Sequence, residues 1–124
     1  MQPTQARTIT GSALFVDVRE GDEYEAGHVE GSAHIPIGEI QARWQELLGH
    51  ETVVVVCQIG QRSGLVTDYL REKGLDAHNL EGGLEAWSRA GLPLTSGSGA
   101  GLVVDGFARD LSGRRITPSP RLLR

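Results

Sequence analysis

The chemistry available to this chain centres on its one cysteine, Cys57, which follows four consecutive valines and precedes the residues QIGQRSG. A thiolate, not a thiol, is the nucleophile, and a helix N-terminus or a nearby arginine lowers a cysteine pKa from its reference value of about 8.5. Gly60 allows a tight loop around the sulfur, and Arg62 brings a positive charge to it. Although free cysteines are commonly buried and inert, a polar, glycine-containing loop packs poorly and favours a reactive thiolate in an anion cradle.

Strand and helix signals alternate along the chain and determine where this cysteine lies. The all-valine run 53–56 predicts a strand that is buried on both faces, as in the middle of a parallel sheet. The other expected strands cover residues 13–18, 33–36 and 77–80, and the expected helices cover 22–26, 38–48, 63–73 and 84–89. Such alternation is typical of an α/β fold with a mostly parallel sheet. Ligands bind such sheets at the carboxyl ends of central strands, which is where Cys57 lies.

Two of the expected helices have an apolar face that should point to the core. In 38–48 the apolar positions form one stripe, and in 63–73 three apolar side chains are expected to face inward. The residues concerned are Ile40, Trp44, Leu47 and Leu48 in the first helix, and Leu65, Tyr69 and Leu70 in the second. Trp44 and Trp87 are therefore interpreted as core residues rather than as ligand platforms.

Length, composition and charge limit the class of protein. A chain of 124 residues with 39% hydrophobic residues is long enough for one domain. One cysteine cannot form an intramolecular disulfide. No apolar stretch approaches the roughly 18 to 20 residues that span a bilayer, and the N-terminus resembles no signal peptide. We therefore expect a cytoplasmic protein without a membrane anchor. Residues 1–94 carry 14 acidic and 7 basic side chains, and only 5% of residues are aromatic, which argues against nucleic-acid binding.

Four stretches in series resemble the rhodanese family. CQIGQRS at 57–63 is similar to its active-site loop, and VDVRE at 16–20, EYEAGHVEGSAHIP at 23–36 and EGGLEAW at 81–87 match in the expected order. The resemblance covers roughly residues 13–94 and implies a single rhodanese-like domain whose mostly parallel sheet is flanked by helices on both faces. It implies that Cys57 takes a sulfane sulfur as a persulfide, without a metal or organic cofactor. The cradle around it would consist of Gln58, Ile59, Gly60, Gln61, Arg62 and Ser63.

The length of the cysteine-to-arginine loop bears on the substrate. The related tyrosine and dual-specificity phosphatases place five residues between cysteine and arginine, whereas only four separate Cys57 from Arg62. A smaller ring suits a terminal sulfur better than a phosphoryl group. We expect a sulfurtransferase that moves sulfur from a donor such as thiosulfate to a thiol or cyanide. A persulfide relay to an unidentified acceptor protein is the alternative, and a small-anion phosphatase or arsenate reductase is disfavoured.

Other polar residues have structural as well as functional interpretations. Asp17 and Arg19 flank the end of the first strand, where they either line the pocket or form a structural ion pair near Arg62; the structural role is preferred. His28 and His34 match no standard zinc spacing and are interpreted as structural. The EGG sequence at 81–83 is expected to form a tight turn.

The two ends of the chain depart from the family pattern. Only twelve residues precede Ala13, so the first strand of the family is expected to be reduced to residues 7–10, with no helix after it. Residues 1–94 are expected to form the domain. Residues 95–124 begin with a glycine-serine linker, carry 2 acidic and 5 basic side chains, and are expected to be disordered, the alternative being a packed segment that replaces the missing strand.

Overall fold

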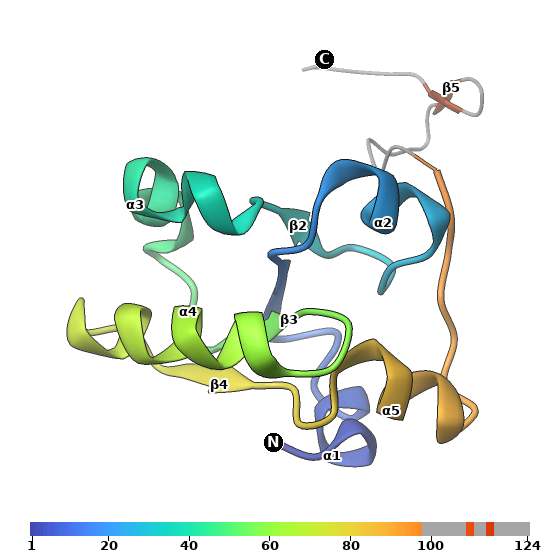
Figure 1. Cartoon of the computed structure of the whole chain (residues 1–124), viewed down its shortest axis with the longest axis horizontal. Coiled ribbons are helices and arrows are strands. Elements are labelled where there is room, and N and C mark those ends of the chain that lie inside the picture. Colours follow the sequence, from blue (N-terminus) through green and yellow to red (C-terminus); the bar gives the residue numbers. More distant parts are fainter. Residues whose placement is uncertain (98–108, 111–113, 116–124) are drawn as a thin grey trace.

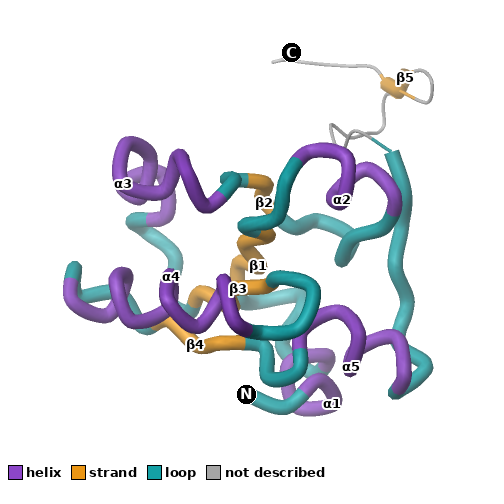
Figure 2. The backbone as a smooth tube through the Cα atoms, viewed as in Figure 1, coloured by secondary structure: helices purple, strands orange, loops and turns teal. Residues whose placement is uncertain are grey.

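The computed structural model describes residues 1–97 and, as backbone only, residues 109–110 and 114–115. The central sheet has four strands in the order β2-β1-β3-β4, and all of its pairings are parallel. Its strands are β1 (Leu14–Asp17), β2 (Ala33–His34), β3 (Val53–Val56) and β4 (Ala77–Asn79). Figure 2 shows these strands grouped at the centre of the molecule with the helices around them. The expected α/β fold with a parallel sheet is confirmed.

Short helices connect the strands (Figure 1). They are α1 (Pro3–Arg7), α2 (Gly21–Ala26), the 3-10 turn η1 (Ile37–Glu39), α3 (Ile40–Arg43), the 3-10 turn η2 (Trp44–Leu47), α4 (Gln61–Glu72) and α5 (Gly83–Arg89). Two further strands, β5 (Arg109–Asp110) and β6 (Arg114–Arg115), pair antiparallel with each other.

The valine run of β3 explains why both faces of the sheet are covered. Val53 and Val55 belong to one apolar cluster, and Val54 and Val56 belong to another, because successive strand side chains point to opposite faces. All four are buried, and complete burial of a valine side chain contributes about 1.5 kcal/mol or more. The first cluster includes Ile40, Val66 and Leu70 from α3 and α4; the second includes Ala6, Leu84 and Trp87 from α1 and α5.

The segment 38–48 is not the single helix that the apolar stripe predicted. The backbone is irregular at Glu39 (φ −108°) and leaves helical geometry at Arg43 (φ −125°), and the segment consists of η1, α3 and η2. Ile40 and Leu47 are buried as expected, whereas Leu48 lies beyond the last turn and is 55% exposed. The prediction for Leu65 is also wrong, since this side chain on the first turns of α4 is 69% exposed.

The N-terminal segment forms a helix where a reduced strand was expected. Pro3 lies at the start of α1, where its fixed φ and missing N–H suit the first helical turn. Arg7 is the last residue of this helix. Residues 8–10 follow as turns, in which each N–H group donates to the carbonyl oxygen three residues earlier. Ala6 is fully buried in the cluster that contains Trp87. The edge of the sheet beside β1 is occupied by β2.

The described chain continues in contact with the domain beyond residue 94. Thr95 forms an isolated antiparallel bridge with His28, and the Gly97 N–H donates to the Glu25 carbonyl oxygen at 2.9 Å. The predicted linker thus begins with residues that are hydrogen bonded to the α2 region. The predictions for the rest of the tail, including disorder, concern residues that lie outside the described ones apart from β5 and β6.

Across the described residues, no helix combines the length and the apolar character needed to cross a membrane.

Candidate active site

Cys57 lies directly after β3, one of the two inner strands of the sheet, at the carboxyl edge where the strand turns toward α4. Its relative exposure is 1%, and its side chain belongs to the apolar cluster on the α3 and α4 face. The residues 57–63, called the cysteine loop below, connect the buried strand to the exposed surface. The fold therefore places the only thiol at the position where open parallel sheets bind ligands.

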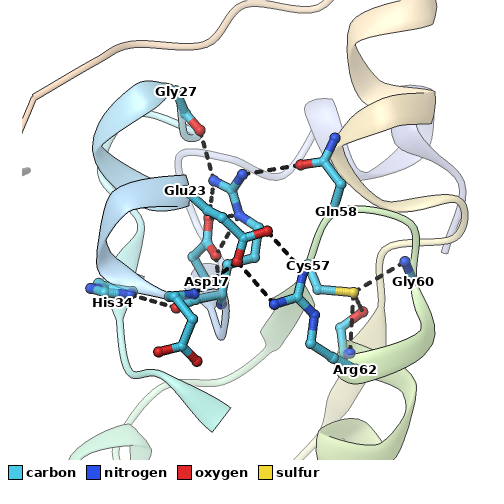
Figure 3. A network of polar contacts seen from close by, with 11 residues as sticks. Asp17, Glu23, Gly27, His34, Cys57, Gln58, Gly60 and Arg62 are labelled. Atoms are coloured by element: carbon cyan, nitrogen blue, oxygen red, sulfur yellow. Dashed lines mark hydrogen bonds and ion pairs between the residues drawn. The ribbon is translucent and has the colours of Figure 1, made fainter.

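Three hydrogen-bond donors converge on the sulfur (Figure 3). The Gly60 N–H lies 3.1 Å from Sγ, the Ser63 N–H lies 3.3 Å from it, and the Ser63 hydroxyl lies 3.2 Å from it. Gly60 caps α4 with φ 101°, a left-handed conformation that glycine adopts readily, and this turn directs the N–H groups inward. The N-terminus of α4 adds the positive end of its dipole. These donors come from two of the six residues predicted to surround the sulfur, Gly60 and Ser63, and their role toward a substrate stays a prediction.

The pKa of the Cys57 thiol reflects two opposing effects. Burial raises the pKa because it disfavours the charged thiolate, but the hydroxyl and N–H of Ser63 and the N–H groups of Gly60 and Ile59 stabilise the thiolate. The hydrogen bonds together outweigh burial, so the pKa lies below its ordinary value. Cys57 can therefore react as a thiolate at a pH where an ordinary cysteine remains protonated.

Asn79, at the end of β4, supports the cradle from the neighbouring strand. Its Nδ2 donates to the Gly60 carbonyl oxygen at 3.1 Å, and its Oδ1 lies 2.5 Å from the Ser63 hydroxyl oxygen. Because that hydroxyl has one proton, Asn79 and Cys57 compete for it. Sequence reasoning missed Asn79. The signal available was its position at the carboxyl end of the strand next to the valine run.

The turn between β4 and α5 packs against the cysteine loop. This glycine turn, residues 81–83, is followed by the Leu84 and Glu85 N–H groups, which donate to the Cys57 and Gln58 carbonyl oxygens at 2.9 and 3.0 Å. At Gly83, φ is +64°, and a Cβ atom would lie 2.4 Å from the Gln58 carbonyl oxygen. The glycine turn thus does more than reverse the chain, since its lack of a side chain lets the backbone reach the cysteine loop.

Arg19 and Asp17 form a buried ion pair beside the loop. Arg19 Nη2 lies 2.9 Å from Asp17 Oδ2, and the exposed fractions of the two side chains are 4% and 1%. Arg19 also donates to the Gly27 carbonyl oxygen at 2.7 Å and to Gln58 Oε1 at 3.2 Å. The structural ion pair of Asp17 was expected near Arg62, but the cation that Asp17 pairs with is Arg19, and Arg62 pairs with a different carboxylate. The contact of Arg19 with Gln58 connects the end of β1 to the cysteine loop.

Arg62 is paired with Glu23, a residue that sequence reasoning did not single out. The Nη1 and Nη2 atoms of Arg62 donate to the two carboxylate oxygens of Glu23 at 2.9 and 3.0 Å (Figure 3). Glu23 Oε1 also accepts the Glu20 N–H in the capping box that begins α2. The hydrogen bond from Arg62 lowers the pKa of Glu23 to about 2. The capping box sequence could have indicated the orientation of Glu23, but not its partner.

The remaining predicted residues lie at the surface or in structural contacts. Gln58, Ile59 and Gln61 are exposed, and Ile59 presents an apolar side chain at the mouth of the loop. A ring nitrogen of His28 bonds to the Tyr24 carbonyl oxygen at 2.6 Å, and one of His34 bonds to the Arg19 carbonyl oxygen at 2.7 Å. Within the part of the chain that the structure describes, no three side chains cluster as metal ligands.

Known proteins share the sequence pattern and the fold of this chain. A family model described as a rhodanese-like domain matches residues 2–90 of the chain. The chain belongs to the rhodanese-like domain family. The crystal structure of a rhodanese-related protein from Thermoplasma volcanium superposes on this rhodanese-like domain with a TM-score of 0.74 and 28% identity, covering 77% of this chain and 95% of that one.

Two curated relatives of the domain are longer proteins. The HTH-type transcriptional regulator Rv0324 of Mycobacterium tuberculosis is 36% identical over 77% of this chain and 43% of that protein. The putative sulfur carrier protein YrkF of Bacillus subtilis is 34% identical over 62% of this chain and 42% of that protein. The chain thus spans less than half the length of these two relatives.

Proposed function

We propose that Cys57 accepts a sulfane sulfur from a donor such as thiosulfate and transfers it to a thiol or cyanide. The observation that carries the proposal is the convergence of the Gly60 N–H, the Ser63 N–H and the Ser63 hydroxyl on Sγ. These donors stabilise the thiolate before attack and the anionic sulfur that leaves in the second step. Gln58, Ile59, Gln61 and Arg62 complete the wall of the site in this proposal, and Asp17 and Arg19 support it.

The reaction proceeds by double displacement at sulfur. The Cys57 thiolate attacks the outer sulfur of thiosulfate, a sulfur–sulfur bond forms, and the old sulfur–sulfur bond breaks with its electron pair leaving on sulfite. The acceptor then attacks the outer sulfur of the Cys57 persulfide, and the electron pair of that bond returns to Cys57 as the thiolate. No electrons are exchanged with an external oxidant or reductant.

A persulfide relay to a partner protein is the second candidate. It is favoured by the similarity to YrkF, whose name describes a putative sulfur carrier, over 62% of this chain. The exposed Ile59 beside the buried Cys57 would lie where an acceptor protein approaches the sulfur. The two candidates share the Cys57 persulfide and differ in acceptor.

Mass spectrometry after incubation with thiosulfate tests the shared step. The wild-type chain should gain one sulfur, about 32 Da, at Cys57, and subsequent cyanide should remove it. Cys57→Ser should fold and show no gain. Rapid steady-state turnover with cyanide supports the enzyme, whereas loading followed by slow turnover supports the relay. Aryl phosphate hydrolysis that is lost in Cys57→Ser, without sulfur loading, would overturn the proposal in favour of a phosphatase.

A further inference from the structure

The two arginines that border the cysteine loop, Arg19 and Arg62, are each paired with a carboxylate. Arg19 donates three hydrogen bonds to Asp17 from its guanidinium and uses its remaining contacts on Gly27 and Gln58. Arg62 uses both terminal nitrogens on Glu23. Within the network drawn in Figure 3, no guanidinium remains free to neutralise an incoming anion.

The donors of the cradle are also occupied. The Gly60 and Ser63 N–H groups point at Sγ, which leaves them to stabilise the sulfur rather than the oxygens of a sulfonate group. Glu20 acts electrostatically on Arg62 as well. Two carboxylates, those of Glu20 and Glu23, therefore act on the one guanidinium of Arg62, and negative charge exceeds positive charge around it. A dianion that approaches a thiolate in this setting meets repulsion without a compensating cation.

We infer that Glu23, by neutralising Arg62, makes this site select sulfane-sulfur donors with at most one negative charge over dianionic thiosulfate. The inference rests on the proposed sulfur transfer and adds the substrate class to it. Organic thiosulfonates and alkyl persulfides are donors of that class. Glu23 acts here as a specificity-determining residue through Arg62, and it does not touch the reacting sulfur.

A matched pair of donors isolates the effect of charge. Methanethiosulfonate, CH₃SO₂S⁻, presents the same outer sulfur as thiosulfate but carries one negative charge less. When the Cys57 thiolate attacks it, the sulfur–sulfur bond breaks and the electron pair leaves on methanesulfinate, so the two donors differ in the charge of donor and leaving group and not in the type of step.

The variant Glu23→Gln frees Arg62 while keeping a carbonyl oxygen that can accept the Glu20 N–H, since glutamine also serves in a capping box. The ratio of kcat/KM for thiosulfate to kcat/KM for methanethiosulfonate should rise about fivefold in this variant, which corresponds to one additional charge interaction near 4 Å in a water-like medium. Glu25→Gln removes the same charge from an exposed position on α2 and should leave that ratio unchanged.

A salt series on the wild-type protein tests the same inference without a substitution. Salt screens repulsion between exposed charges, so kcat/KM for thiosulfate should rise with ionic strength. This rise should be smaller in Glu23→Gln than in the wild-type protein. An unchanged donor ratio in Glu23→Gln, an equal change in Glu25→Gln, or a wild-type thiosulfate rate that falls with salt would overturn the inference. If neither donor adds sulfur to wild-type Cys57, the proposed function itself fails.

Discussion

Two strand-to-helix turns lie at the carboxyl edge of the sheet and use glycine in similar ways for different purposes. The cysteine loop turns β3 into α4 through Gly60, and the glycine turn leads β4 into α5 through Gly82; both caps have positive φ, 101° and 74°. In the first turn the N–H groups point at Sγ. After the second turn they point at the carbonyl oxygens of the first, those of Cys57 and Gln58.

The difference shows how a reactive thiol can be held in place by backbone from another part of the chain. Gly60 is required mainly for its conformation, since the nearest atom to an added Cβ would be the Gly82 nitrogen at 3.3 Å. Gly83 is required for space, since three backbone atoms of Cys57 and Gln58 lie within 2.6 Å of such a Cβ. One turn surrounds the thiol and the other fixes the position of that turn.

Removing the space at the glycine turn should have the largest effect. Gly83→Ala must displace the cysteine loop, and we expect a loss of unfolding free energy of about 3 kcal/mol together with at least a hundredfold loss of sulfur transfer. Gly91→Ala is the matched control, because Gly91 also has positive φ (77°) but an added Cβ there meets nothing within 4 Å. It should cost about 1 to 2 kcal/mol and retain activity. Urea melts and sulfur-transfer assays compare the two, and equal activities would show that the glycine turn does not position the loop.

Removing one donor from the cysteine loop should have an intermediate effect. Ser63→Ala deletes the hydroxyl that lies 3.2 Å from Sγ but keeps the backbone N–H, so the pKa of Cys57 should move up toward its ordinary value. Below the pKa of the wild-type thiol, the rate of alkylation by iodoacetamide should fall roughly tenfold. Ser88→Ala, at an exposed position on α5, should change nothing. Coincident pH profiles for Ser63→Ala and wild type would mean that the serine proton stays on Asn79.

The smallest expected effect concerns the support of the cysteine loop by α2. The pKa of Glu23 is lowered from 4.5 to about 2, so its ionised form stabilises the folded state fully above about pH 4.5, and this contribution is lost as the pH falls through about 2. Both partners are about one-third exposed, so Glu23→Gln should cost less than about 1 kcal/mol at pH 7. The free energies of unfolding of the wild-type protein and of Glu23→Gln, measured by urea melts, should converge as the pH approaches 2. A difference that grows on acidification would contradict the assignment.

The sequence by itself determined three features: the alternation of strands and helices along the chain, the buried valine strand, and the position of the one thiol at the end of that strand. A run of four valines has few alternatives to a strand covered on both faces, and a glycine-containing polar loop after it leaves the sulfur at the sheet edge. Local patterns also identified the cradle, because the donors at Gly60 and Ser63 are three and six residues from Cys57 in the chain.

Only the tertiary structure decided what surrounds that loop. Glu23 lies 39 residues from Arg62 in sequence, and Asn79 lies 16 residues from Ser63, so neither pairing follows from local propensity. Local patterns also failed for Leu65, which occupies an apolar helix position but faces outward. They failed for residues 7–10 as well, where a strand was expected and the chain instead finishes α1, which packs against α5, and continues in turns. The parallel sheet brings these segments together through crossover connections, and such contacts are set by packing over the whole domain rather than by neighbours along the chain.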